Sequence, residues 1–143
     1  MDINTGDTAW VLTSAALVLF MTPGLALFYG GMVRAKSVLN MMMMSFIAMA
    51  TISVVWVLWG YSQTFGSSWH GLVGNPFEHA GLSGVLDAAY GSEGHLIPGA
   101  AFVAFQVVFA IIAVALISGA IADRARFLAW TVFTVVWSTV VYF

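Results

Sequence analysis

The sequence has no cysteine among its 143 residues and only four basic side chains. Without cysteine there is no disulfide framework and no thiolate metal site. Charged residues make up 7% of the chain, apolar residues make up 62%, and the mean hydropathy is +0.99. So little polar surface cannot cover a soluble globule of this size. The composition therefore indicates a membrane protein, and the absence of a basic stripe excludes a nucleic-acid partner.

All the basic residues lie in two short gaps between long apolar runs. They are Arg34, Lys36, Arg124 and Arg126. Cytoplasmic loops retain Lys and Arg because membrane insertion disfavours moving these side chains across. We therefore expect the gaps at 34–36 and 123–126 to be cytoplasmic, and the N-terminus and the segment 62–97 to lie outside. This predicts a multi-pass protein of the cell membrane.

Four apolar runs match the length of a membrane helix, which needs about 20 residues. They cover residues 8–33, 38–61, 98–122 and 127–143. The last run, about 25 Å at helical rise, is slightly short of the hydrocarbon core. The segment 62–97 is rich in glycine, and its apolar stretches are too short to span. The sequence therefore predicts an all-α polytopic membrane protein with four transmembrane helices and one long outer loop.

Two pairs of small residues mark helix faces where another backbone can approach closely. Ala26 and Gly30 form one small-xxx-small pair, and Ala115 and Gly119 form the other. Large aromatic residues close the second span, and we expect these to sit in the outer interfacial belt, where such rings are enriched. They are Trp56, Trp59 and Tyr61.

No Asp, Glu, Lys, Arg or His lies inside the four predicted spans, so the chain by itself offers no intramembrane proton relay. Serine and threonine within the spans are expected to bond to their own backbone or to a neighbouring helix. Gln106 differs, because a carboxamide in mid-span should face protein or water. Both an interhelical hydrogen bond and a role along a transport path are open to it.

Three phenylalanines, Phe102, Phe105 and Phe109, lie at i, i+3 and i+7 and form one aromatic stripe on the third span. Periodicity alone favours packing or lipid contact for such a stripe. An aromatic face can nevertheless hold a cation, and bulky rings can close a narrow apolar pore.

The three histidines, His70, His79 and His95, all fall in the outer loop, and their spacing matches no standard metal motif. We predict solvated loop residues there. The spans contain no Ser-His pair, paired carboxylates or metal cluster, so we expect no catalytic site, no metal, no cofactor and no enzyme.

Several blocks of the sequence together form a pattern that is specific to one protein family. The longest block runs from Thr22 to Ser45 and reads TPGLALFYGGMVRAKSVLNMMMMS. Shorter ones are DTAW at 7–10, SAALVL at 14–19, WGYS at 59–62, AFQ at 104–106 with Phe109, and GAIADRARF at 119–127. In this order the blocks resemble the ammonium transporter family, within the ammonium transporter/Rhesus superfamily. They are spread along the chain on both sides of the outer loop.

The resemblance implies an eleven-helix inverted-repeat transporter fold, of which residues 1–143 would be the N-terminal part. It also implies a homotrimer in the lipid bilayer, with a separate path for ammonium or ammonia through each subunit. Phe105 and Phe109 match the family's outer-vestibule and gate positions, and Gln106 lies between them. The family's paired channel histidines come after the position that matches Phe143. We therefore expect the chain alone, as a fragment, to be inactive.

Other interpretations are a small self-standing four-helix protein that oligomerises, and a Rhesus-type ammonia gas channel. The apolar C-terminus at Tyr142 and Phe143 argues against the first, and the GLALFYGGMVR block favours the ammonium transporter branch over the second. The resemblance further suggests a PII-type regulatory protein docking on the cytoplasmic face near Arg124 and Arg126. Ammonium ion and ammonia gas both stay open as the conducted species.

Overall fold

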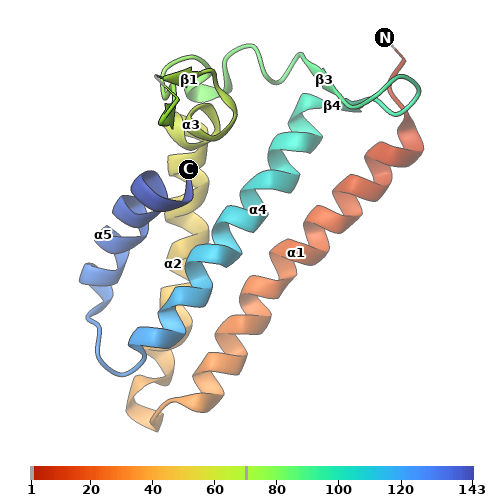
Figure 1. Ribbon diagram of the computed structural model, residues 1–143. Coiled ribbons are helices and arrows are strands. Elements are labelled where there is room, and N and C mark those ends of the chain that lie inside the picture. The colour runs from red at the N-terminus through yellow and green to blue at the C-terminus, as the bar shows by residue number, and fades with distance from the viewer. Residues whose placement is uncertain (1, 70) are drawn as a thin grey trace.

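The computed structural model describes residues 2–69 and 71–143 and places four long helical segments side by side (Figure 1). The α-helices are α1 (Thr5–Met32), α2 (Val38–Val55), α3 (Tyr61–Phe65), α4 (Gly99–Ile117) and α5 (Phe127–Trp137). Short helical turns of other types extend them, namely η1 (Ala35–Ser37), η2 (Trp56–Gly60), η4 (Ser118–Ile121) and η5 (Ser138–Tyr142). The connection from α1 to α2 and the connection from α4 to α5 lie at the same end of the bundle (Figure 1).

Three helical segments are long and apolar enough to cross a membrane. They cover Thr5–Met32, Ala35–Phe65 and Gly99–Ile121, and a shorter apolar helix follows at Phe127–Tyr142. The predicted all-α membrane fold is confirmed. The apolar surface of the chain agrees with a membrane fold. Helix α1 exposes a row of large apolar side chains that a soluble protein would not leave in water. The row includes Leu17, Phe20, Leu27 and Phe28.

The first helix starts earlier than residue 8 because Asn4 caps it. The side-chain oxygen of Asn4 accepts a hydrogen bond from the backbone N–H of Asp7 at 3.0 Å. Asp7 also places a negative charge in the first turn, where the helix dipole favours it. Pro23 lies inside α1, and the helix continues through it. A membrane helix tolerates such a residue when its neighbours pack closely.

The small-residue faces are contact points between helices. Ala26 and Gly30 are buried on α1, which packs against both α2 and α4. At Gly119 an added Cβ would stand 2.6 Å from Cζ of Tyr29, so only glycine leaves room for that ring. The Tyr29 hydroxyl then donates a hydrogen bond to the carbonyl oxygen of Leu116 at 3.0 Å. This joins α1 to the end of α4.

Polar groups join α2 to α5 inside the bundle. The hydroxyl oxygens of Thr51 and Thr134 lie 3.1 Å apart, and each hydroxyl also contacts a carbonyl of its own helix. The buried indole of Trp130 donates to the carbonyl oxygen of Met44 at 2.8 Å. The prediction that hydroxyl side chains would bond to their own or a neighbouring helix is confirmed for these residues.

The predicted aromatic belt at the end of the second span is wrong for two of its three members. Trp56 is 2% exposed and Tyr61 is 1% exposed, so both belong to the core. The ring centroids of Trp56 and Tyr61 lie 5.9 Å apart, edge to face, and Phe143 packs against Trp56 at 5.5 Å. Trp59 is half-buried and donates its indole N–H to Thr139 at 3.1 Å. The elements that surround this end bury rings whose position at the end of the span alone would place them in the interface.

We name residues 62–97 the outer segment, and the end of the bundle that carries them the outer end, after the orientation that the sequence predicts. The outer segment contains two short antiparallel hairpins. β1 (Ser68–Trp69) pairs with β2 (Val73–Gly74), and β3 (Ala89–Tyr90) pairs with β4 (Ile97–Pro98). A short 3-10 turn, η3 (Ala80–Leu82), lies between the hairpins. An isolated bridge between Ile3 and Leu96 fastens the N-terminal residues to the second hairpin. Since β4 runs directly into α4, the second hairpin sets the position of that helix.

Replacing Gly119 with alanine should destabilise the fold by about 1–3 kcal/mol, because the Tyr29 ring must move and lose its hydrogen bond to Leu116. Gly31→Ala is the matched control, since an added Cβ at Gly31 meets nothing within 4 Å. The control should be neutral or stabilise by up to about 1 kcal/mol, because alanine has the better helix propensity. The free energy of unfolding in detergent measures both. Equal values for the two variants would show that α1 and α4 do not pack closely at Gly119.

Candidate functional site

The candidate site lies on the outer half of α4, where two phenylalanine rings meet. Phe105 and Phe109 are one helical turn apart, and their ring centroids lie 5.1 Å apart at an interplanar angle of 68°. This edge-to-face arrangement is favourable for aromatic pairs. Phe105 is half-buried and Phe109 is 39% exposed, so the pair has a free side.

The third ring of the predicted stripe has different partners. Phe102 is stacked on Tyr90 of β3, with centroids 4.6 Å apart and an interplanar angle of 9°. Phe65 of α3 contacts the same ring edge to face at 5.2 Å. The structure therefore divides the stripe into Phe105 and Phe109, which pair with each other, and Phe102, which packs against the outer segment.

Gln106 lies between the paired phenylalanines along the helix and is half-buried. Its side chain has no hydrogen-bond partner among residues 2–69 and 71–143. The interhelical hydrogen bond considered for this residue is thus absent from the described part of the chain. The carboxamide keeps both a donor and an acceptor free for another group.

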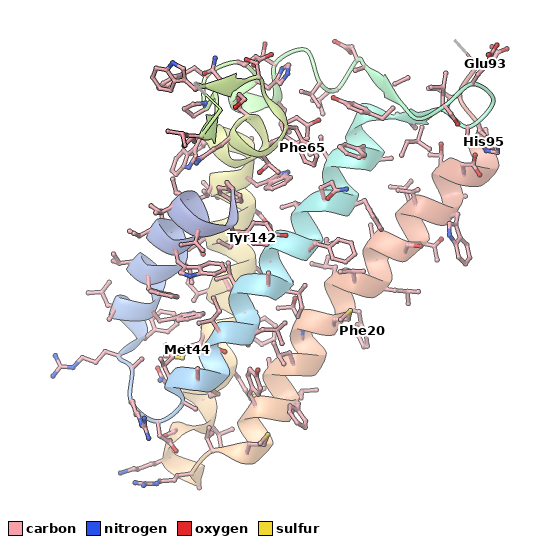
Figure 2. All side chains as sticks on the ribbon, viewed as in Figure 1. Phe20, Met44, Phe65, Glu93, His95 and Tyr142 are labelled. Atoms are coloured by element: carbon pink, nitrogen blue, oxygen red, sulfur yellow. The ribbon has the colours of Figure 1, made fainter. Side chains whose placement is uncertain are left out.

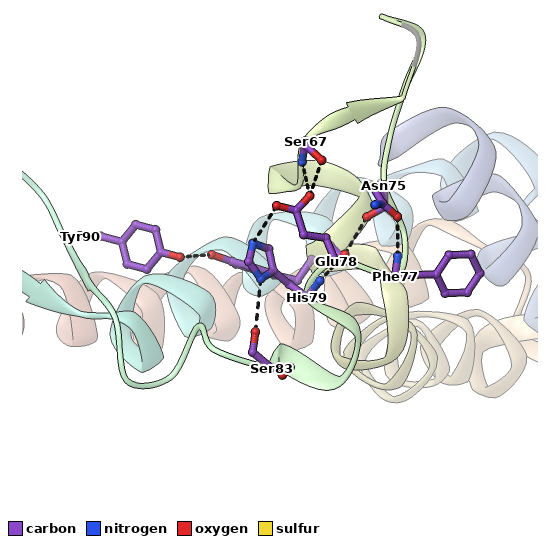
Figure 3. Close-up of polar contacts among 9 residues, drawn as sticks. Ser67, Asn75, Phe77, Glu78, His79, Ser83 and Tyr90 are labelled. Carbon is purple, nitrogen blue, oxygen red and sulfur yellow. Dashed lines mark hydrogen bonds and ion pairs between the residues drawn. The ribbon is translucent and has the colours of Figure 1, made fainter.

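Two histidines make polar contacts at this end of the chain, and Figure 3 shows one of them, His79. The Nδ1 atom of His79 lies 3.2 Å from the carbonyl oxygen of Ser83, and Nε2 lies 3.8 Å from a carboxylate oxygen of Glu78. His95 lies near the start of α1 (Figure 2), where its Nδ1 contacts the Asp7 carboxylate at 2.8 Å. His70 lies outside the described residues.

Figure 3 shows Glu78 between two polar neighbours. One carboxylate oxygen accepts hydrogen bonds from the hydroxyl and from the backbone N–H of Ser67, the latter at 2.6 Å. The hydroxyl bond, followed by the backbone bond, lowers the pKa of the Glu78 carboxyl below its ordinary value. Within the described part of the chain, no group of three or more His, Cys, Asp or Glu side chains could hold a metal ion.

A cleft of about 540 Å³ opens between the start of α1 and the second hairpin. Its walls combine the Asp7 and His95 pair with apolar and aromatic side chains, among them Trp10, Tyr90 and Phe102. Phe105 and Phe109 do not line this cleft. The paired rings and the cleft are therefore separate features of the outer end.

Residues 9–143 match the model of the Ammonium Transporter Family. The chain belongs to this family. An ammonium transporter from Mycobacterium bovis is 54% identical to it, over 96% of this chain and 32% of the relative. An ammonium transporter from Bacillus subtilis is 47% identical, over 98% of this chain and 34% of the relative. Members of this family are transporters or channels, so the chain is a multi-pass membrane protein of a transport family.

Solved ammonium transporter structures have the same fold. The crystal structure of Saccharomyces cerevisiae Mep2 aligns with a TM-score of 0.84 at 32% identity, over 98% of this chain and 31% of that one. A Candida albicans Mep2 mutant, delta442, aligns with a TM-score of 0.81 at 34% identity, over 98% of this chain and 34% of that one. The chain thus spans about a third of the length of the relatives it matches.

Sequence reasoning overlooked Tyr90, which the structure stacks on Phe102, three residues before Phe105 of the candidate site. Tyr90 lies in a glycine-rich segment with no helical or strand period, so no pattern distinguished it from a solvated loop residue. Its hydroxyl lies 2.8 Å from that of Tyr61, and its ring stacks on Phe102. The only available signal was its aromatic character close to Ile97 and Pro98, where α4 was expected to start.

Acidification should release Ser67 from Glu78 only below the ordinary pKa of a glutamate. The folded-state pKa is lowered, so the contribution of this carboxylate to stability is present above the ordinary pKa and is lost as the pH falls through the lowered one. The amide resonance of Ser67, followed by NMR, should titrate with a midpoint below the ordinary pKa of a glutamate. In Glu78→Gln this titration should vanish. A midpoint at or above the ordinary pKa would contradict the hydrogen-bonding arrangement.

Proposed function

We propose that residues 1–143 form the first part of a unit that conducts ammonium or ammonia across the cell membrane. Family membership supports the substrate, since the relatives are ammonium transporters. The observation that carries the site is the edge-to-face contact of Phe105 and Phe109, at the two positions that resemble the family's vestibule and gate.

The chemistry of this pair suits a small cation or its neutral form. An aromatic face attracts a cation through its quadrupole and offsets part of the hydration that a small ion loses. A bulky apolar constriction rejects ions that keep their water. Gln106, next to Phe105 in the helix, adds a carboxamide with no hydrogen-bond partner among the described residues. We infer that Phe105 and Gln106 receive the substrate and that Phe109 controls its entry.

The conduction path needs a second wall. In transporters built from repeats, the binding path lies between the repeats. This chain spans about a third of its relatives, and α1 exposes apolar side chains that further helices or lipid would cover. We propose that such helices complete the path, that the complete assembly is a homotrimer, and that a PII-type protein meets the end that carries Arg124 and Arg126.

We also propose that this end is cytoplasmic. The two connections that contain all the basic residues lie together at one end of the bundle, and the two hairpins and the described N-terminal residues lie at the other (Figure 1). The positive-inside rule then gives the direction of the whole bundle.

Reporter fusions test this orientation. Green fluorescent protein joined after Lys36 or after Asp123 should fluoresce, and alkaline phosphatase joined near His79 should be active, because those sites face opposite compartments. Exchanging the two reporters at each site provides the internal control. Active phosphatase after Lys36 together with a fluorescent fusion at His79 would reverse the proposed direction.

Shortening the side chain of Phe109 tests the proposed transport function. Residues 1–143 replace the matching part of the Bacillus subtilis relative, and methylammonium uptake is measured in cells that lack their own uptake system. Phe109→Ala should change the rate or the selectivity by about tenfold or more, because it removes the ring that closes the path. Phe46→Ala on α2 is the control, since Phe46 is 41% exposed and Phe109 is 39% exposed.

Three outcomes are informative in this experiment. The unmodified chimera should take up methylammonium, and residues 1–143 alone should not, because the opposite wall is missing. An inactive but folded chimera would contradict the proposed transport function. Equal, near-native uptake in Phe109→Ala and Phe46→Ala would reduce the phenylalanine pair to a packing contact.

A further inference from the structure

The outer end of α4 is held by aromatic side chains that do not belong to the proposed gate. The hydroxyl of buried Tyr61, at the start of α3, lies 2.8 Å from the hydroxyl of Tyr90. The ring of Tyr90 in turn lies almost parallel to Phe102, at 4.6 Å and 9°. A chain of contacts thus runs from the end of the second membrane segment, through the outer hairpin, to the first turn of α4.

Phe65 closes this chain into a cluster. Its ring contacts Phe102 edge to face at 5.2 Å and lies 5.1 Å from the ring of Tyr61. Figure 2 shows Phe65 at the outer end, on the side of α3 that faces α4. Tyr90 covers one face of the Phe102 ring, and Phe65 contacts the same ring at an interplanar angle of 65°. The cluster therefore restricts both the side chain of Phe102 and the rotation of α4 at this point.

The backbone ties Tyr90 to the same turn of α4. Tyr90 is paired with Ile97 in the second hairpin, and α4 starts at Gly99. The N–H of Gly99 donates to the carbonyl oxygen of Ala88 at 2.7 Å. A Cβ on Gly99 would stand only 2.0 Å from the carbonyl oxygen of Val85, so the backbones touch there. Any displacement of the hairpin therefore moves the start of the helix.

The proposed gate residues, Phe105 and Phe109, follow Phe102 along α4. Phe105 follows Phe102 by three residues, about 4.5 Å along the axis and on the same side of the helix. The ring of Phe105 has Phe109 of its own helix as its aromatic partner in the described part of the chain. The paired rings consequently take their place from α4 itself, and the aromatic anchor of α4 is Phe102.

We propose that Tyr90 is a positioning residue for the aromatic gate: its stacking on Phe102 sets the rotation of α4 and so the placement of the Phe105 and Phe109 rings. This inference rests on the proposed transport role of that pair. It assigns the outer hairpin a part in conduction without any contact between Tyr90 and the substrate.

The placement of the gate ring can be measured without transport. We would introduce 4-fluorophenylalanine at position 105 of residues 1–143 and record its fluorine NMR resonance in detergent. Tyr90→Leu should shift or split this resonance, because the flat contact with Phe102 is lost. Tyr90→Phe should leave it unchanged, since the ring remains. Phe77→Leu is the matched control, because Phe77 is an aromatic residue of the same outer segment that is 79% exposed.

Transport gives the second measurement, in the chimera described above. Tyr90→Leu should lower kcat per folded transporter by about 2- to 12-fold, the range that the loss of an aromatic pair allows, with a smaller change in KM. Tyr90→Phe and Phe77→Leu should stay within about twofold. Tyr90→Met, whose flexible side chain fills the space without a flat ring, replaces Tyr90→Leu if that variant does not fold.

The two measurements distinguish the positioning role of Tyr90 from the proposed transport function. An unchanged fluorine resonance in folded Tyr90→Leu and Tyr90→Met would overturn the positioning role while leaving the transport function intact. An inactive unmodified chimera would overturn the transport function, whereas the resonance would still report whether Tyr90 positions the ring. A uniform fall in kcat for Tyr90→Phe, Phe77→Leu and Tyr90→Leu would assign Tyr90 a structural role only.

Discussion

Every backbone N–H and C=O that crosses the hydrocarbon must find its partner inside the protein, because lipid offers none. The rest of the structure depends on this constraint. It makes each apolar run a helix, and α1, which contains Pro23, packs against both α2 and α4. It also explains why hydroxyl side chains such as Thr51 and Thr134 bond to their own helices as well as to each other.

Once the helices exist, close contact determines how they assemble. Lipid is as apolar as leucine, so shape and hydrogen bonds must hold the helices together. Gly119 admits the ring of Tyr29 at one end of the bundle, and the hydroxyl of that ring bonds to Leu116. At the other end, aromatic packing between α3, the second hairpin and α4 joins the close backbone contact at Gly99. The two ends of α4 are thus anchored by different means.

The candidate site lies on α4, between the two anchored ends of this helix. The Phe105 and Phe109 rings pair along one helix, and Gln106, between them in the sequence, makes no side-chain hydrogen bond within residues 2–69 and 71–143. In the proposed function, such a surface forms one wall of a path, and the chain spans about a third of its relatives. The second hairpin is directly connected to this site, because the helix that carries the rings starts where β4 ends.

The sequence alone determined the helices, the membrane class and the family, because the length and polarity of a run are local properties and the blocks around Thr22 to Ser45 are distinctive. Through resemblance it also predicted Phe105, Gln106 and Phe109 as site residues, and through spacing it identified the Ala115 and Gly119 face. Only the tertiary structure decided that Trp56 and Tyr61 are buried, that Tyr90 stacks on Phe102, and that His95 meets Asp7. These contacts join residues far apart in the chain, and no local period encodes which distant side chain will cover a given ring.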